Sequence, residues 1–321
     1  MLRRVATIAL ILGIAGCGGA QFSAAPGPSH AATQSRVAAA PHGRTWMAPE
    51  AKRDDLLYVS NVFDVTVYSY PQGKLVGTLS NFDNPYGECV DAKGNVYITD
   101  SKFGRIYEYA HGGTKPIATL SDKEYQPFGC AIDPTTGNLA VDNYETNWDY
   151  PGDVAIYRKA RGFPQSYVVE GLYYYYYCGY DSSGNLYVDG LNNGGFNFAF
   201  ARLAKGSHTL EYVLLPQSIT YPGGVAWDGT YLAVGDQAGA AIYQFSFTKG
   251  QPKLQGRTTL TGAGLVGQFA IADSTVVAPD QLNSTSNVLF YPYPAGGNPT
   301  QTITNGVSFP YSAAISPAAA R

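Results

Sequence analysis

Oxygen-bearing side chains recur where short apolar segments end, at Asn61, Asp100, Asn143, Asp236 and Asp280. Carboxylates and amides placed in this way have two uses. They accept or donate hydrogen bonds to neighbouring backbone, as buried polar groups must, or they converge on a hard cation such as Ca²⁺. We interpret the five residues as a structural polar ring, and the cation site is the alternative.

Three cysteines follow position 80, at Cys89, Cys130 and Cys178. None is accompanied by a suitable His, so we do not expect a thiol nucleophile. Cys89 stands two residues before an Asp and Cys130 stands three before, so strand alternation turns them to opposite faces. The sequence therefore permits a Cys89–Cys130 disulfide, and small buried apolar residues are the alternative.

Sequence motifs of common enzyme classes do not occur. The chain has no Gly-x-Ser-x-Gly elbow, no phosphate-binding loop and no His-Glu-x-x-His helix. We therefore assign no catalytic residue, no metal ligand and no cofactor.

The N-terminus predicts export. Arg3 and Arg4 precede the apolar run Val5 to Ile14, and small residues follow. This is the pattern of a secretory signal, over residues 1–16. The ending Ile-Ala-Gly-Cys resembles the bacterial lipobox, which implies that Cys17 is acylated and anchors the protein to a membrane. An ordinary signal with a chance Cys is the alternative.

Residues 17–53 are rich in Ala, Ser, Pro, Gln and Gly, without apolar periodicity. Such a segment cannot bury a core, so it is predicted to be a disordered tether. A net charge of −3 with no basic cluster argues against nucleic acid as a partner. We expect an extracytoplasmic monomer at the outer membrane or cell surface.

From residue 54 to 321 the sequence repeats itself. A motif of Pro, aromatic, Gly, apolar residues and Asp recurs, followed by a turn and a strand; its first copies end at Asp91, Asp133, Asp181 and Asp228. The spacing of 42 to 48 residues is that of a propeller blade with four strands. Six copies predict an all-β, six-bladed β-propeller. The sixth copy is split: an innermost strand at Pro310–Ser316 pairs with strands beginning at Leu56 and closes the ring.

These repeats resemble NHL repeats and the wider group of TolB-like, gluconolactonase-like and strictosidine-synthase-like propellers, over about residues 54–316. In gluconolactonase-like enzymes, metal ligands stand just before the Gly of the motif. The matching positions here include Tyr86, Phe128, Tyr176 and Tyr311, none of which offers a carboxylate or amide. The resemblance therefore implies the fold and argues against that metal site.

The same four aromatic residues give the leading functional hypothesis. They are expected to surround one mouth of the central channel, where tyrosines suit a sugar ring, a peptide or an aromatic compound. Packing between blades is the alternative. We expect a ligand-binding or protein-binding scaffold, with an unknown small molecule, glycan or protein as partner. A hydrolase or lyase acting at the channel mouth is the alternative function.

Overall fold

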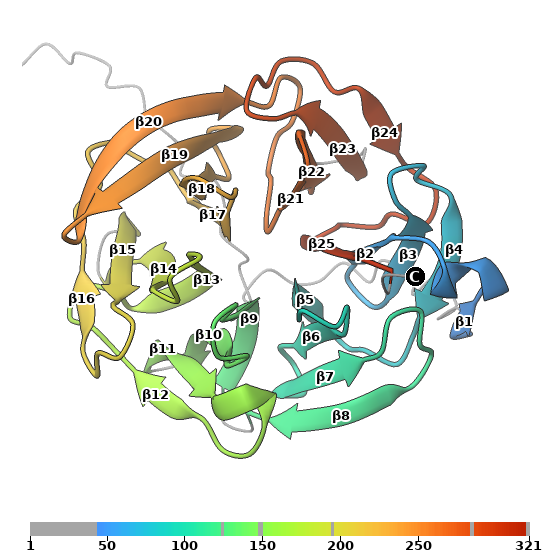
Figure 1. Cartoon of the computed structure of the whole chain (residues 1–321), viewed down its shortest axis with the longest axis horizontal. Helices are drawn as coiled ribbons and strands as arrows, with labels where there is room; N and C mark the ends of the chain where they lie inside the picture. The colour runs from blue at the N-terminus through green and yellow to red at the C-terminus, as the bar shows by residue number, and fades with distance from the viewer. Residues whose placement is uncertain (1–43, 123–124, 147–149, 194–195, 283–285, 319–321) are drawn as a thin grey trace, which may run out of the picture. The chain divides into compact units, whose positions relative to one another are not determined.

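The computed structural model describes residues 44–122, 125–146, 150–193, 196–282 and 286–318. Six antiparallel sheets stand around one axis as the blades of a propeller (Figure 1). In the described ranges the helical segments are two 3-10 turns, η1 (Pro49–Lys52) and η2 (Arg158–Ala160). The predicted fold class, an all-β six-bladed propeller with four-stranded blades, is confirmed.

The strands fall into four positions, counted outward from the axis. The innermost strands are β5 (Pro85–Val90), β9 (Tyr125–Ile132), β13 (Tyr174–Tyr180), β17 (Pro222–Trp227), β21 (Ala270–Ala272) and β25 (Ser312–Ser316). The second strands are β2 (Leu56–Ser60), β6 (Val96–Asp100), β10 (Leu139–Thr146), β14 (Leu186–Leu191), β18 (Leu232–Asp236) and β22 (Thr275–Asp280). The third strands are β3 (Val65–Ser69), β7 (Arg105–Tyr109), β11 (Tyr150–Tyr157), β15 (Phe198–Leu203), β19 (Ala241–Thr248) and β23 (Asn287–Pro292). The outer strands are β4 (Leu75–Leu79), β8 (Pro116–Ser121), β12 (Gln165–Tyr167), β16 (Leu210–Tyr212), β20 (Gln251–Thr259) and β24 (Gln301–Ile303).

We number the blades by the chain: blade 1 contains β2, β3, β4 and β25, and blades 2 to 6 contain β5–β8, β9–β12, β13–β16, β17–β20 and β21–β24. The second strands are buried on both faces because each blade packs between two neighbours. Their sequences therefore read as nearly continuous apolar runs, as in Leu-Leu-Tyr-Val-Ser of β2, in place of a clean alternation.

The turn between the first and second strands of a blade is fixed by the Asp that ends the motif. The Asp91 carboxylate accepts hydrogen bonds from the backbone N–H groups of Lys93 and Asn95 at 2.8 and 2.9 Å. Gly94 supplies the positive φ of 80° that this turn needs. Asp181 makes the same pair of bonds in blade 4. The recurring Asp and Gly are therefore turn-forming residues.

The ring closes in blade 1 as the split repeat predicts. The C-terminal strand β25 pairs antiparallel with β2, from Leu56 opposite Ser316 to Ser60 opposite Ser312. In Figure 1 the red β25 lies beside the blue strands of the same sheet. The pairing covers the inner edge of β2, so blade 1 has the same four strand positions as the other blades.

A strand is present before the predicted boundary at residue 54. Strand β1 (Trp46–Met47) adds a fifth strand to blade 1 by pairing with β4, at Trp46 opposite Thr78. The turn η1 follows, and its Ala51 is buried. The sequence suggested tether here because a two-residue strand is too short to show a period. The signal peptide, Cys17 and the tether up to residue 43 lie outside the described residues.

All strands within a blade are antiparallel, so the second and outer strands end on the same side of the ring. The loops that follow them therefore share one face. We call this side the loop face.

Candidate functional site

The four aromatic residues predicted at the channel mouth gather at the axis, on the loop-face side, where the innermost strands begin. The Tyr86 ring stacks on Phe128 with centroids 3.7 Å apart and on Tyr311 at 4.4 Å. Tyr176 meets Phe128 edge-on at 5.6 Å. Tyr86, Phe128 and Tyr176 are buried. We call the four residues the aromatic plug, because their rings contact one another across the space where a mouth was expected.

Stacking continues from the aromatic plug towards the rim. Phe128 stacks on Tyr144, Tyr144 on Tyr174, and Tyr174 on Phe196, with centroids 4.9, 4.8 and 6.1 Å apart. The end of this row, Phe196, is 66% exposed. Buried rings at the axis thus lead directly to an exposed ring on the loop face.

Below the aromatic plug, two side chains reach across the axis between blades. The Gln268 amide of blade 6 donates to the carbonyl oxygens of Glu88 at 2.9 Å and Cys130 at 3.2 Å. Its oxygen accepts from the Glu88 backbone N–H at 3.2 Å. Tyr177 of blade 4 extends to blade 6, where a Cβ on Gly267 would lie 3.2 Å from its hydroxyl. At this depth the axis is filled by side chains.

Three carboxyl groups are buried near these cross-axis contacts. Burial raises the pKa of Glu88 to about 8, although Ser60 donates a 2.9 Å hydrogen bond to it. Burial also raises the pKa of Asp142 and Asp189 well above the usual range, and the Asp142 charge adds to the effect at Asp189. A neutral carboxyl group is a weak ligand for hard cations, so near neutral pH Glu88 serves as a hydrogen-bonding partner of Ser60.

The predicted polar ring binds backbone. The Asp100 carboxylate accepts from the N–H groups of Asp83 and Asn84 at 3.1 and 3.2 Å. Asp236 likewise accepts from the backbone N–H groups of Tyr221, in the loop before β17, and Gly239, in the loop after β18. Since Asp100 also bonds the backbone of Phe103, in both blades the buried carboxylate holds the incoming loop against the loop that leaves the second strand.

The amides of the polar ring make similar contacts. Asn61 accepts from the Ser308 backbone N–H at 2.9 Å and so fixes the loop before β25. Asn143 instead donates to the Asp153 carboxylate at 2.7 Å. Within the described ranges, no group of three or more His, Cys, Asp or Glu side chains lies close enough to hold a metal ion.

A disulfide joins Cys89 of blade 2 to Cys130 of blade 3, with their Cα atoms 5.7 Å apart. It links neighbouring innermost strands, the pair that the opposed alternation singled out. Cys178 is a buried free thiol. Burial, followed by the neighbouring Asp142 carboxyl, raises the pKa of this thiol well above its usual value.

The feature that sequence reasoning missed is a set of large apolar side chains exposed on the loop face. They come from loops of five different blades: Phe63, Phe103, Val168, Phe196, Leu214, Leu282 and Phe309. The signal was present, because Phe63, Phe103 and Leu282 each follow a polar-ring residue by two or three positions. Asp280 even accepts from the Leu282 backbone N–H, at 3.1 Å.

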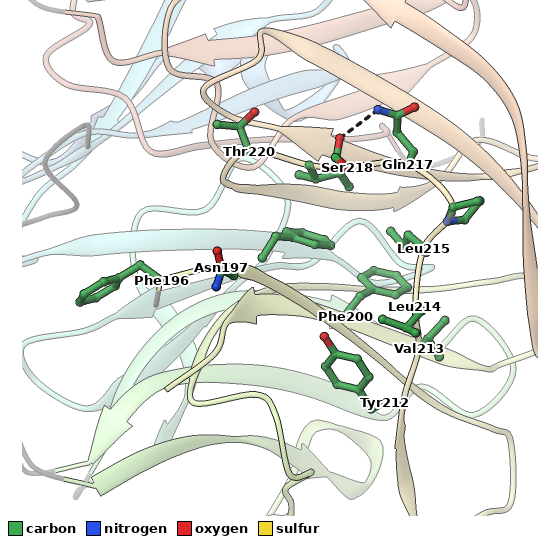
Figure 2. Close-up of a pocket in the computed structure, with 13 residues that line it drawn as sticks. Phe196, Asn197, Phe200, Tyr212, Val213, Leu214, Leu215, Gln217, Ser218 and Thr220 are labelled. Atoms are coloured by element: carbon green, nitrogen blue, oxygen red, sulfur yellow. Dashed lines mark hydrogen bonds between the residues drawn. The ribbon is translucent and has the colours of Figure 1, made fainter. Parts of the chain in front are cut away.

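A groove of about 480 Å³ opens beside Phe196 at the rim of the loop face (Figure 2). One wall comes from β15 of blade 4, and the other from residues 212–220, which connect blade 4 to blade 5. In Figure 2, Phe200 lies on the first wall, with Val213 and Leu215 on the second.

Comparison with known proteins identifies the fold. No family model and no curated protein matches the sequence. A chain in the crystal structure of a nidogen/laminin complex superposes with a TM-score of 0.66 at 14% identity, covering 82% of this chain and 98% of that one. A protein of unknown function from Bacteroides caccae does so with a TM-score of 0.60 at 9% identity and the same coverage. This chain is a six-bladed β-propeller, and likeness at such low identity shows the fold alone.

Among the described residues, no helix is long and apolar enough to cross a membrane.

Proposed function

We propose that the protein is an extracytoplasmic lipoprotein whose propeller binds a protein partner through its loop face. Acylation of Cys17 would anchor it to a membrane, and residues 18–43 would set the propeller apart from the lipid headgroups. The outer membrane or cell surface is the proposed location. The blades would belong to the NHL-like group of propellers, and we propose a monomer in solution.

The observation that supports this proposal is the set of large apolar side chains exposed on the loop face. Apolar side chains gathered on one side of a protein mark interaction surfaces, and aromatic anchors usually supply much of the binding free energy. A cation–π contact orients the Phe103 ring, because the Arg105 guanidinium lies 5.7 Å from the ring centroid. The ring is thereby positioned for binding. The polar ring fixes several of these loops, so binding would cost little conformational entropy.

The spread of these residues favours a protein over a small ligand. They stand on loops of five blades around a filled axis, whereas small-molecule sites are concave and enclose most of the ligand. A partner of broad surface is therefore the better fit. In the nidogen/laminin structure, the similar chain is likewise part of a protein complex.

Site-specific photo-crosslinking in the cells that express the protein tests the proposal. A photoreactive phenylalanine analogue at Phe103 or Phe309 should give the same discrete cross-linked product. The matched control is Phe163, which is 97% exposed and lies between η2 and β12, on the opposite side of the ring. Equal products from both faces, or none from the loop face, would contradict the proposed function.

A further inference from the structure

The residues that line the groove beside β15 restrict what can bind there. Its lining, residues 196–198, 200 and 212–220, contains no charged side chain. Leu214 on its outer wall is 79% exposed, and the groove adjoins Phe196 of the loop face. An occupant must therefore be uncharged over this stretch, because a buried charge would find no partner there.

The wall that β15 contributes to the groove is an incomplete strand edge. Strand β16 pairs with β15 at only three positions, from Leu203 opposite Leu210 to Ala201 opposite Tyr212. One more bond follows, from the Val213 N–H to the Phe200 carbonyl at 2.8 Å, and the outer chain then leaves the edge. In blade 2, by contrast, β8 pairs along the whole of β7.

The alternation of an antiparallel strand identifies the groups left without partners. The Phe200 carbonyl points outward to Val213, so the N–H and C=O of Phe198, two residues earlier, point outward as well. Ala199 between them points inward and pairs with Gly190 of β14. Within the described ranges, the backbone of Phe198 makes no hydrogen bond on its outer side.

We propose that this groove takes an extended, uncharged peptide segment of the partner, which adds to the free edge of β15 as a strand. The inference rests on the proposed function and names the chemistry of its ligand. An unpaired backbone donor and acceptor between apolar walls select a peptide backbone, whereas an acyl chain would leave both groups unsatisfied. Apolar side chains at alternate positions would contact Phe198 and Leu215.

Peptide binding to the purified full chain in detergent tests the inference. The probes are fluorescent octapeptides in which valine or phenylalanine alternates with threonine, measured by anisotropy up to roughly millimolar concentration. N-methylation at the residue that pairs with Phe198 should weaken binding about tenfold, the effect of losing one hydrogen bond of about 1.4 kcal/mol. N-methylation at the next residue, whose N–H points away from β15, should change it less than twofold.

Protein variants and amide exchange give independent readouts. Leu215→Arg should abolish peptide binding, whereas Leu254→Arg on the outer strand of blade 5 should not; equal melting temperatures would exclude a folding defect. Bound peptide should slow exchange of the Phe198 amide at least tenfold and leave Ala199 unchanged. No binding by any probe, unaltered Phe198 exchange, or equal loss at both N-methyl positions would overturn the inference.

The experiments distinguish a failure of the proposed peptide binding in the groove from a failure of the proposed loop-face function. If cross-linking from Phe103 and Phe309 succeeds while no peptide binds, the loop face is a binding surface and the strand addition is wrong. If the protein forms a dimer that Leu215→Arg dissociates, the occupant is a second copy of the chain and the choice of a partner peptide is overturned.

Discussion

Replacing Glu88 with Gln should stabilise the protein near and above neutral pH. The carboxyl is 1% exposed, and its Oε2 atom has no hydrogen-bond partner within the described ranges. Ser60 bonds the other oxygen, and Ser312 lies beside the group. A neutral carboxyl can donate from Oε2 towards Ser312, which an ionised one cannot. The Gln side chain has the shape and hydrogen-bonding pattern of that neutral form.

The magnitude follows from the pKa of Glu88, which is about 8 in the folded chain against an ordinary value of 4.5. Below pH 4.5 both states hold the proton, so this group causes no pH dependence. Between 4.5 and 8 the unfolded chain releases the proton while the folded chain keeps it, so stability falls as pH rises. The loss is about 3 kcal/mol at pH 7 and about 5 kcal/mol above pH 8.

Urea denaturation of the full chain from pH 5 to pH 9 measures this effect. Wild type and Glu88→Gln should be nearly equal at pH 5 and diverge by several kcal/mol at pH 9, with the variant more stable. The matched control is Glu170→Gln at an exposed position, which should follow the wild type throughout. Parallel curves for wild type and Glu88→Gln, or a variant less stable at pH 9, would refute the assignment of a buried neutral carboxyl.

Three further outcomes are expected. Cys17→Ala should move the protein from the membrane fraction to the soluble fraction, and equal membrane association of variant and wild type would contradict the lipid anchor. Deleting the chain from Pro310 removes β25 and exposes the edge of β2, so the ring should melt at a lower temperature; unchanged cooperative melting would contradict closure by this strand. Tyr86→Ala should cost about 3–5 kcal/mol, as loss of a buried aromatic does, and unchanged melting with weakened partner binding would instead support the ligand-binding interpretation of the aromatic plug.

The blades could be predicted because their information is local. The Asp91 turn needs a carboxylate two to four residues from the N–H groups it binds, so the motif carries its own geometry and repeats with the blade. Ring closure by residues 310–316 followed from completing the sixth repeat. These features depend on short spacings that recur along the chain.

Other features depend on contacts between distant blades, which no spacing encodes. Gln268 lies 180 residues from Glu88 yet bonds both its N–H and its C=O. Nothing at position 268 distinguishes a side chain that crosses the axis from one that lines an open channel. The sequence therefore predicted that Tyr86 and its counterparts gather at the axis, but it left open whether they line a mouth or fill it.

The same repeat produces both the side chains that fill the axis and the loops of the loop face. In five of the six blades a buried polar residue stands at or near the end of the second strand, and in blades 2, 5 and 6 its carboxylate binds backbone of the loops around it. These loops are thereby fixed by groups that lie below the surface, so the residues exposed at their tips are not needed for the fold. Phe103 or Leu282 can then serve recognition alone, while the aromatic plug and Gln268 hold the blades together at the centre. Under the proposed function, variation at the loop tips would change the partner without disturbing the ring, and this separation favours binding at the loop face over chemistry at the axis.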